Sequence, residues 1–151
     1  MRFSPPREFM SLEQALAHLL AHLGDELGDA GGARFRVFAI GKAKMLKPEI
    51  QEQICLIARE ALINAGRHSK ATSIEAEVQY LPRRLRVLVR DNGCGIDPKS
   101  VQWDGDANGG LTGMRDRALR LEARLKIRSR RGAGTEVELL ISGRCLAEAY
   151  L

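Results

Sequence analysis

The chain has 151 residues, of which 44% are hydrophobic and 28% charged, and its 24 lysines and arginines against 19 acidic residues give a net charge of +5. This length corresponds to one domain. The composition argues against intrinsic disorder, and no apolar run approaches the roughly 20 residues that span a bilayer. The positive charge alone leaves open a nucleic acid as a partner, because lysine and arginine neutralise phosphates.

Three cysteines, Cys55, Cys94 and Cys145, lie far apart in the chain. Their odd number and the lack of Cys-x-x-Cys spacing argue against a disulfide framework and against a zinc site. A reducing compartment fits this pattern, and no apolar stretch typical of a secretion signal follows the first charged residue. We therefore expect a cytoplasmic domain. This expectation is compatible with a parent protein that is anchored in a membrane by another segment.

Residues 1–10 contain two adjacent prolines and no periodic pattern, so we interpret them as an arm or linker. Ser11 and Gln14 have the spacing of a capping box, in which each side chain bonds the backbone N–H of the other residue. Leucines and alanines then recur every three to four positions. This periodicity predicts an amphipathic helix that ends near Gly24 or Gly28.

The next segments alternate between strand and helix patterns. Over 34–40, Phe35, Val37 and Ala39 alternate with Arg34, Arg36 and Phe38, which predicts a strand with one wetter face. Pro48 suits the first turn of a helix, and the apolar stripe behind it predicts a helix of about 18 to 20 residues. Two further alternating segments, 73–80 and 84–90, flank a turn that contains Pro82 and predict a hairpin with one dry and one charged face.

Residues 91–113 are rich in glycine and aspartate and are expected to form a long loop, which in a compact domain is usually functional. A helix over about 112–123 and strands over 125–129 and 135–141 are expected to follow. The last residues, 143–151, are interpreted as a C-terminal tail.

Two hairpins in this order are incompatible with a doubly wound parallel sheet, because the strands of a hairpin are antiparallel. The pattern predicts instead an α+β protein, a two-layer sandwich with a mixed, mostly antiparallel sheet and all helices on one face. The single domain is expected to span 11–142.

Four polar residues lie along one flank of the second predicted helix, near its end: Glu60, Asn64, Arg67 and His68. The amide oxygen of Asn64 suits a hard cation such as Mg²⁺, and a carboxylate one turn earlier can orient a water molecule. An arginine offers a phosphate-binding fork, and a histidine ring can lie against a base. Taken alone, such residues are more often the solvated face of a helix.

A second cluster begins where an apolar strand runs into Asp91 and two glycines, Gly93 and Gly95. A carboxylate at a strand end can accept hydrogen bonds, for instance from an exocyclic amine, and glycines let a ring approach the backbone. Asp-x-Gly-x-Gly is also a common turn.

A third cluster, over 109–114, places small residues at a predicted helix start, where free N–H groups attract phosphate. It is neither a Walker A loop nor a Rossmann fingerprint, because no Gly-Lys-Ser/Thr follows and no strand-turn-helix unit surrounds it.

In this order and spacing the clusters resemble the ATP-binding fold shared by sensor histidine kinases, type II topoisomerases, Hsp90 and mismatch-repair ATPases, known as the Bergerat or GHKL fold. The resemblance is strongest to the catalytic and ATP-binding domain of two-component sensor histidine kinases of the nitrate-sensor subfamily. It covers roughly 11–142 and is carried by four stretches: Ile57–His68, Asp91–Asp97, Gly110–Arg117 and Gly134–Val137.

The resemblance implies ATP and Mg²⁺ as cofactors and assigns a role to each matching residue. Asn64 would ligate Mg²⁺ beside the catalytic Glu60, Arg67 would reach the phosphates and His68 would flank the nucleotide. Asp91 would accept a hydrogen bond from the adenine amino group. The remaining nucleotide-binding residues would be Gly93 and Gly95 beside the base, Gly110, Leu111 and Gly113 on the phosphate side, and Thr135 at the base end.

Residues 97–109, with Trp103, would form a short acidic lid over the nucleotide. The implied reaction is transfer of the γ-phosphoryl group of ATP to a histidine on a separate dimerisation domain, in two-component signal transduction with a response regulator downstream. His18 and His22 are followed by leucines and not by the acidic residue expected after an acceptor histidine. We therefore expect the catalytic part of a longer sensor, monomeric and unable to phosphorylate itself in isolation, with no direct nucleic-acid partner.

Three alternatives remain. A topoisomerase- or chaperone-like ATPase would need a longer lid and a second domain, for which 151 residues leave no space. A serine-phosphorylating anti-sigma kinase has the same fold and is often free-standing at this length. A basic binding module without catalysis would bind nucleic acid independently of ATP.

Overall fold

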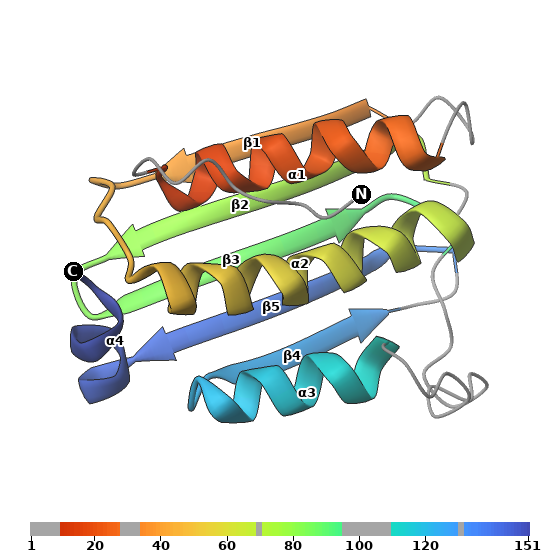
Figure 1. The fold of residues 1–151 in the computed structure, drawn as a ribbon. Helices are drawn as coiled ribbons and strands as arrows, with labels where there is room; N and C mark the ends of the chain where they lie inside the picture. Colours follow the sequence, from red (N-terminus) through yellow and green to blue (C-terminus); the bar gives the residue numbers. More distant parts are fainter. Residues whose placement is uncertain (1–9, 28–33, 69–70, 95–109, 130–131) are drawn as a thin grey trace.

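The computed structural model describes residues 10–27, 34–68, 71–94, 110–129 and 132–151. Three helices, α1 to α3, lie side by side on one face of a five-stranded sheet (Figure 1). The elements are α1 (Leu12–Leu27), β1 (Arg34–Ile40), α2 (Pro48–His68), β2 (Ser73–Leu81), β3 (Arg84–Asp91), α3 (Gly110–Arg120), β4 (Arg124–Ser129), β5 (Thr135–Ser142) and α4 (Gly143–Ala149).

The strands follow one another across the sheet in the order β1-β2-β3-β5-β4. Only β1 and β2 are parallel, and α2 forms the crossover between them. The other three pairings are antiparallel, and two of them, β2 with β3 and β4 with β5, join consecutive strands. The prediction of an α+β sandwich with a mixed, mostly antiparallel sheet and helices on one face is confirmed.

The core lies between the sheet and the three helices. Along β2 and β3 every second side chain is buried on the helix side, as the alternation in the sequence predicts. The start of α1 also has the predicted capping box, since Ser11 N donates to Gln14 Oε1 at 3.0 Å and Gln14 N donates to Ser11 Oγ at 3.3 Å. Burial of such apolar faces contributes roughly 25 cal/mol per Å². Among the most completely buried side chains are Leu12, Leu16, Ile54, Leu62, Ile74, Leu85 and Leu139.

A polar contact joins the first helix to the sheet at the edge of this core. The Tyr80 hydroxyl of β2 donates to Glu13 Oε2 at 2.5 Å. Burial and the neighbouring Glu13 carboxylate raise the pKa of Tyr80 well above its ordinary value, so the hydroxyl stays protonated and remains a donor. This hydrogen bond therefore contributes to holding α1 against β2.

The C-terminal residues, for which the sequence predicts a tail, contain α4, which lies at the end of the sheet opposite to the ends of β3 and β4 (Figure 1). Leu146 and Ala149 of this helix are buried against the core. Behind α4 the chain pairs with the segment before α2, because Lys47 N donates to Ala149 O at 2.8 Å and Leu151 N donates to Met45 O at 2.9 Å. The limits 11–142 stay a prediction, and these contacts show which part of the fold α4 supports.

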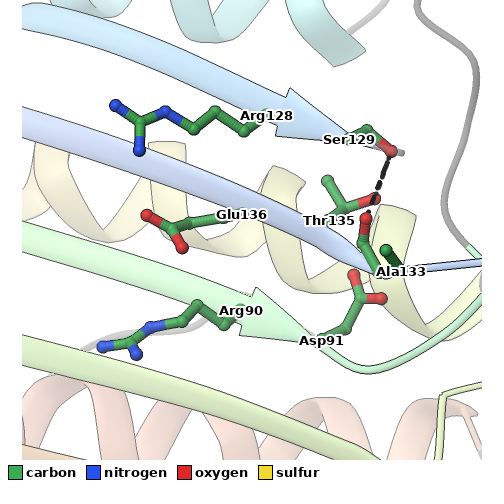
Figure 2. A pocket seen from close by; sticks show the side chains of 8 residues that line it. Arg90, Asp91, Arg128, Ser129, Ala133, Thr135 and Glu136 are labelled. Atoms are coloured by element: carbon green, nitrogen blue, oxygen red, sulfur yellow. Dashed lines mark hydrogen bonds between the residues drawn. The ribbon is translucent and has the colours of Figure 1, made fainter.

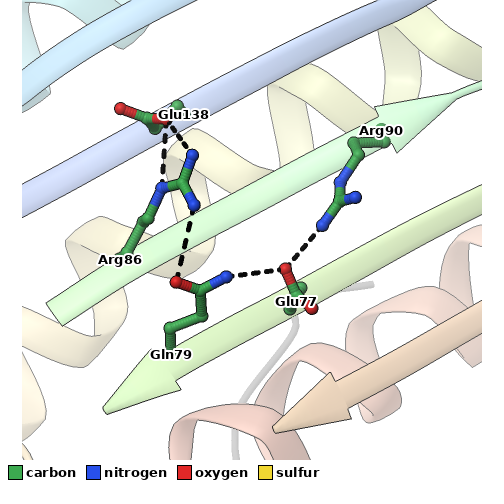
Figure 3. Close-up of polar contacts among 5 residues, drawn as sticks. All are labelled: Glu77, Gln79, Arg86, Arg90 and Glu138. Carbon is green, nitrogen blue, oxygen red and sulfur yellow. Dashed lines mark hydrogen bonds and ion pairs between the residues drawn. The ribbon is translucent and has the colours of Figure 1, made fainter. Parts of the chain in front are cut away.

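The sheet face away from the helices is charged, as predicted. Arg86 of β3 donates through Nε and Nη2 to Glu138 of β5, at 3.1 and 2.6 Å (Figure 3). Arg90 pairs with Glu77 of β2, and Gln79 bridges Glu77 and Arg86. The Arg86 guanidinium lowers the pKa of the Glu138 carboxyl. The network links three neighbouring strands.

Candidate nucleotide site

The predicted clusters meet at one end of the sheet. The end of β3, the start of β5, the last turn of α2 and the first turn of α3 all lie there (Figure 1). This follows from the topology, because β3 and β4 run toward this end while β5 starts from it. Motifs that are far apart in the sequence thus belong to one region of the fold.

Asp91 is the last residue of β3 and is half-buried. It belongs to the same side of the strand as Val87 and Val89, whose side chains lie in the core, so it faces the helix side. Its Oδ1 accepts a hydrogen bond from Gly93 N at 2.9 Å. This hydrogen bond, from the backbone two residues further on, is typical of an Asp in a turn. It fixes the carboxylate at the end of the strand.

Gly134 lies against the backbone of Asp91. Its φ is +81°, and a Cβ atom there would collide with the Asp91 carbonyl oxygen. No other residue type fits this position without a shift of the backbone. Gly134 belongs to one of the four stretches that carry the family resemblance, but its packing on Asp91 depends on the pairing of β3 with β5, which no local pattern predicts.

Thr135 is the register partner of Asp91 across β3 and β5. The hydroxyls of Thr135 and Ser129 share a hydrogen bond of 2.8 Å. Figure 2 shows Asp91, Ser129 and Thr135 together at the strand ends, with α2 behind the sheet. They line an open pocket of about 270 Å³ at the strand ends together with Ala133 and Gly134, and the pocket continues onto the sheet face away from the helices, where Arg90, Arg128 and Glu136 line it. Ser129 is a site residue that the sequence patterns do not indicate.

Glu60 and Asn64 are one turn apart on α2, and both are half-buried. Arg67 and His68 form part of the last turn of the same helix, but their side chains lie outside the described residues. The helix α2 packs on both β3 and α3, and its last turn lies at the same end of the sheet as the end of β3 and the start of α3 (Figure 1).

The third cluster opens α3, which begins at Gly110, two residues before the predicted start. Leu111 lies in the first turn, although its side chain is outside the described part of the chain. Gly113 has open space around it, since a Cβ there would meet no described atom within 4 Å. The described part of the fold therefore gives no reason for a glycine at this position. Gly95 and the predicted lid over 97–109 lie outside the described residues.

The described donor set fits Mg²⁺ that is bound together with ATP phosphates. The described residues contain no group of three or more His, Cys, Asp or Glu side chains that could hold a metal ion. Mg²⁺ typically takes one or two protein oxygens and completes its shell with water and substrate phosphates. The half-buried Asn64 and Glu60 at the helix end fit this arrangement.

Two further observations concern the surroundings of the site. Within the described ranges, no helix is long and apolar enough to cross a membrane. Burial raises the pKa of the Cys55 thiol on α2 to about 12, so this cysteine is inert at neutral pH. Cys94, which follows Gly93 directly, is exposed, whereas Cys55 is buried.

The fold is a two-layer α+β domain of the ATP-binding type, with helices on one face of a mixed sheet. The chain belongs to the family of histidine kinase-, DNA gyrase B- and HSP90-like ATPases, which residues 49–143 match. The sequence-based prediction of this family and of its fold is confirmed.

The sequence relatives are sensor kinases. The chain is 38% identical over 81 residues to the nitrate/nitrite sensor protein NarX of Escherichia coli (strain K12), and 30% identical over 96 residues to the signal transduction histidine-protein kinase/phosphatase DegS of Bacillus subtilis (strain 168). The matches cover 54% and 64% of this chain but only 13% and 25% of those proteins. The prediction of the ATP-binding domain of a sensor histidine kinase is thereby confirmed.

A solved structure shows the same fold. The histidine kinase domain of the blue-light activated kinase from Erythrobacter litoralis EL346 superposes with a TM-score of 0.75 at 23% sequence identity. The superposition covers 94% of this chain and 65% of that one. The similarity therefore extends well beyond the residues that match the family.

Proposed function

We propose that this domain binds MgATP at the described end of the sheet and presents the γ-phosphate to a histidine on a separate dimerisation domain of its parent protein. The names of the sequence relatives support a histidine as acceptor. The observation that carries the proposal is the Asp91 carboxylate, which Gly93 N holds on the helix side of the sheet end while the Asp91 backbone packs against Gly134.

At the base end, Asp91 would accept a hydrogen bond from the adenine amino group. Thr135, its register partner, would bound the same pocket, and the buried Gly93 and the more distal Gly95 would leave room for the ring. A charged acceptor that is fixed in advance makes a stronger hydrogen bond than a neutral one. It also favours adenine over bases that carry a carbonyl at the same position, because two acceptors would then face each other.

At the phosphate end, Asn64 would ligate Mg²⁺, and Arg67 and His68 in the last turn of α2 would bind the phosphates or flank the nucleotide. Gly110, Leu111 and Gly113 would supply the first turn of α3, where backbone N–H groups and the helix dipole favour anions. The bound ion would neutralise the charge that develops on the phosphates during transfer. A small residue at Gly113 would keep the phosphate side open.

Little covalent chemistry falls to this domain. In phosphoryl transfer an imidazole nitrogen forms the new bond to phosphorus while the bond to the leaving oxygen of ADP breaks, and catalysis consists largely of positioning and charge stabilisation. Glu60, one turn before Asn64, would accept a hydrogen bond from the attacking group and orient it. The nucleophile itself belongs to the partner domain.

Phosphotransfer in trans tests this proposal. The chain is mixed with the purified histidine-containing helical domain of its parent protein and γ-labelled ATP with Mg²⁺. We expect acid-labile label on that domain, at least about tenfold less with Glu60→Gln, and unchanged label with Glu52→Gln, an exposed glutamate on the same helix. Acid-stable label on a serine would favour the anti-sigma type of kinase, and no label at all would contradict the proposal.

A further inference from the structure

Asn92, the residue after Asp91, makes a concentrated set of hydrogen bonds. Its Oδ1 accepts from the backbone N–H groups of Thr72 and Ser73, both at 2.9 Å, and its Nδ2 donates to Thr72 Oγ1 at 2.8 Å. Its own backbone N donates to Ser73 O at 3.2 Å. One residue thus makes four hydrogen bonds to two neighbouring residues of another segment.

These bonds extend the sheet beyond its last register pair. The ladder between β2 and β3 ends where Ile74 lies opposite Asp91. Beyond that point the Asn92 side chain takes the place of a backbone peptide, because an amide offers one acceptor and one donor group. The exit of the chain from β3, directly behind Asp91, is therefore fixed to the entry of the chain into β2.

The other side of the same segment is held by the turn between β4 and β5. Gly132 N donates to Cys94 O, and Gly134 packs on the Asp91 carbonyl. The segment from Asp91 to Cys94 is therefore attached to both of its neighbours. Of the two attachments, only that of Asn92 uses a side chain, so it is the one that a substitution can remove cleanly.

The attachment also reaches the helix that carries the phosphate-end residues. Thr72 follows the end of α2 at His68 by four residues. Asn92 thereby connects the Asp91 turn to the segment that leaves α2. The base end and the phosphate end of the proposed site thus share one junction.

We infer that Asn92 is a positioning residue of the nucleotide site, which fixes the Asp91 carboxylate in the orientation that selects adenine. The inference rests on the proposed function of Asp91. Asn92 acts through the backbone of its neighbour, since its own amide is committed to Thr72 and Ser73. A loss of its hydrogen bonds should therefore affect discrimination between bases more than binding of the triphosphate.

The test compares the affinities of the chain for ATP and for inosine triphosphate, which has a carbonyl in place of the adenine amino group. For Asn92→Ala we expect ATP binding to weaken about tenfold and the preference for ATP to fall by a similar factor. Asn92→Asp should restore the preference, because a carboxylate can accept from both N–H groups and from the Thr72 hydroxyl. Thr72→Val removes only one partner and should lower the preference about twofold to fivefold, which keeps the test available if Asn92→Ala does not fold.

A purely structural role would have a different signature. Ser11→Ala, which removes a cap of α1 far from the site, serves as the control for lost stability. If Asn92→Ala weakened the binding of both nucleotides equally, or left the preference unchanged, the inference would be overturned. Absence of ATP binding by the unmodified chain, or equal binding by Asp91→Asn, would instead refute the proposed function.

Discussion

At the level of single residues, two glycines in the turn between β4 and β5 have nearly the same backbone conformation but different surroundings. Gly132 has φ of +83°, and a Cβ added to it would meet no described atom within 4 Å, whereas a Cβ on Gly134 would collide with the Asp91 carbonyl. We expect Gly132→Ala to lower the free energy of unfolding by about 1 kcal/mol, the cost of a positive φ.

Gly134→Ala should cost at least about 3 kcal/mol, because the collision with Asp91 adds to the same conformational strain. It should also weaken ATP binding, since Asp91 must move. Denaturant unfolding and nucleotide titration of the two variants check this. Equal losses of stability in both would show that the close approach to Asp91 is unimportant.

At Gly113, one substitution is expected to change the stability of the fold and the affinity for ATP in opposite directions. Alanine is favoured over glycine in a helix by about 1 kcal/mol, and the described surroundings of Gly113 leave space for a methyl group. Gly113→Ala should therefore raise the thermal stability of the chain and lower its affinity for ATP. If the variant became more stable with ATP affinity unchanged, Gly113 would have no role in nucleotide binding.

The residues that can be predicted from sequence are those whose role depends on local spacing. Motifs identify Asp91 and Asn64, and the structure places both at one end of the sheet. Ser129 lies in no motif, and the motif that contains Asn92 does not reveal its role, because the partners of the Asn92 side chain lie in another segment of the chain. Their roles follow only from the register.

At the level of elements, the network on the open sheet face predicts a pH-dependent stability. The pKa of Glu138 is lowered in the folded state, so its contribution is fully present above the unfolded pKa of about 4.3 and is lost as the pH falls through the folded value. We expect Glu138→Gln to be about 1 to 2 kcal/mol less stable than the unmodified chain at pH 7.

That difference should shrink as the pH falls below about 4.3. Glu148→Gln is the control, because its pair with Arg144 is largely exposed and should contribute little. Urea unfolding across this pH range measures both variants. A difference for Glu138→Gln that stays constant with pH would show that the charge of this carboxylate is not the source of the stabilisation.

The last helix, α4, is expected to contribute to the stability of the fold. Leu146 is 5% exposed, whereas Leu119 on α3 is 72% exposed. Leu146→Ala should lower the free energy of unfolding by about 2 to 3 kcal/mol, and Leu119→Ala by less than about 0.5 kcal/mol. Thermal unfolding checks this. If Leu146→Ala were as stable as Leu119→Ala, α4 would not contribute to the fold.

The elements themselves are largely predictable, because strand alternation and helix periodicity are strong along this chain. β1 has the predicted bounds, and α2 begins at the predicted Pro48. The helix α4 is not predictable in this way, since seven residues with two buried side chains carry too short a periodicity. The predicted start of α3 lies two residues late, because glycine has a low helix propensity and the sequence pattern therefore does not mark the first residues of this helix.

At the level of the whole molecule, the basic residues behind the net charge of +5 are spread over several strands and helices. In one row across the open face, the register partners alternate in sign. The row consists of Arg36, Glu75, Arg90, Glu136 and Arg128. This alternation favours a surface on which opposite charges compensate one another over a groove that binds nucleic acid.

The order of the strands is predictable only in part. The hairpins follow from short connections, but the placement of β5 beside β3 depends on how the whole sheet buries its apolar face. That placement brings Thr135 and Gly134 to Asp91. The motifs therefore name most of the candidate residues, and how these residues lie together follows only from the complete fold.

The most direct test of this account is calorimetric titration of the chain with ATP in the presence of Mg²⁺. We expect saturable binding by the unmodified chain, binding at least about tenfold weaker by Asp91→Asn, and unchanged binding by Asp116→Asn, an exposed aspartate on α3. No binding by the unmodified chain at millimolar MgATP, or an Asp91→Asn variant that binds as well as the unmodified chain, would contradict the assignment of the site.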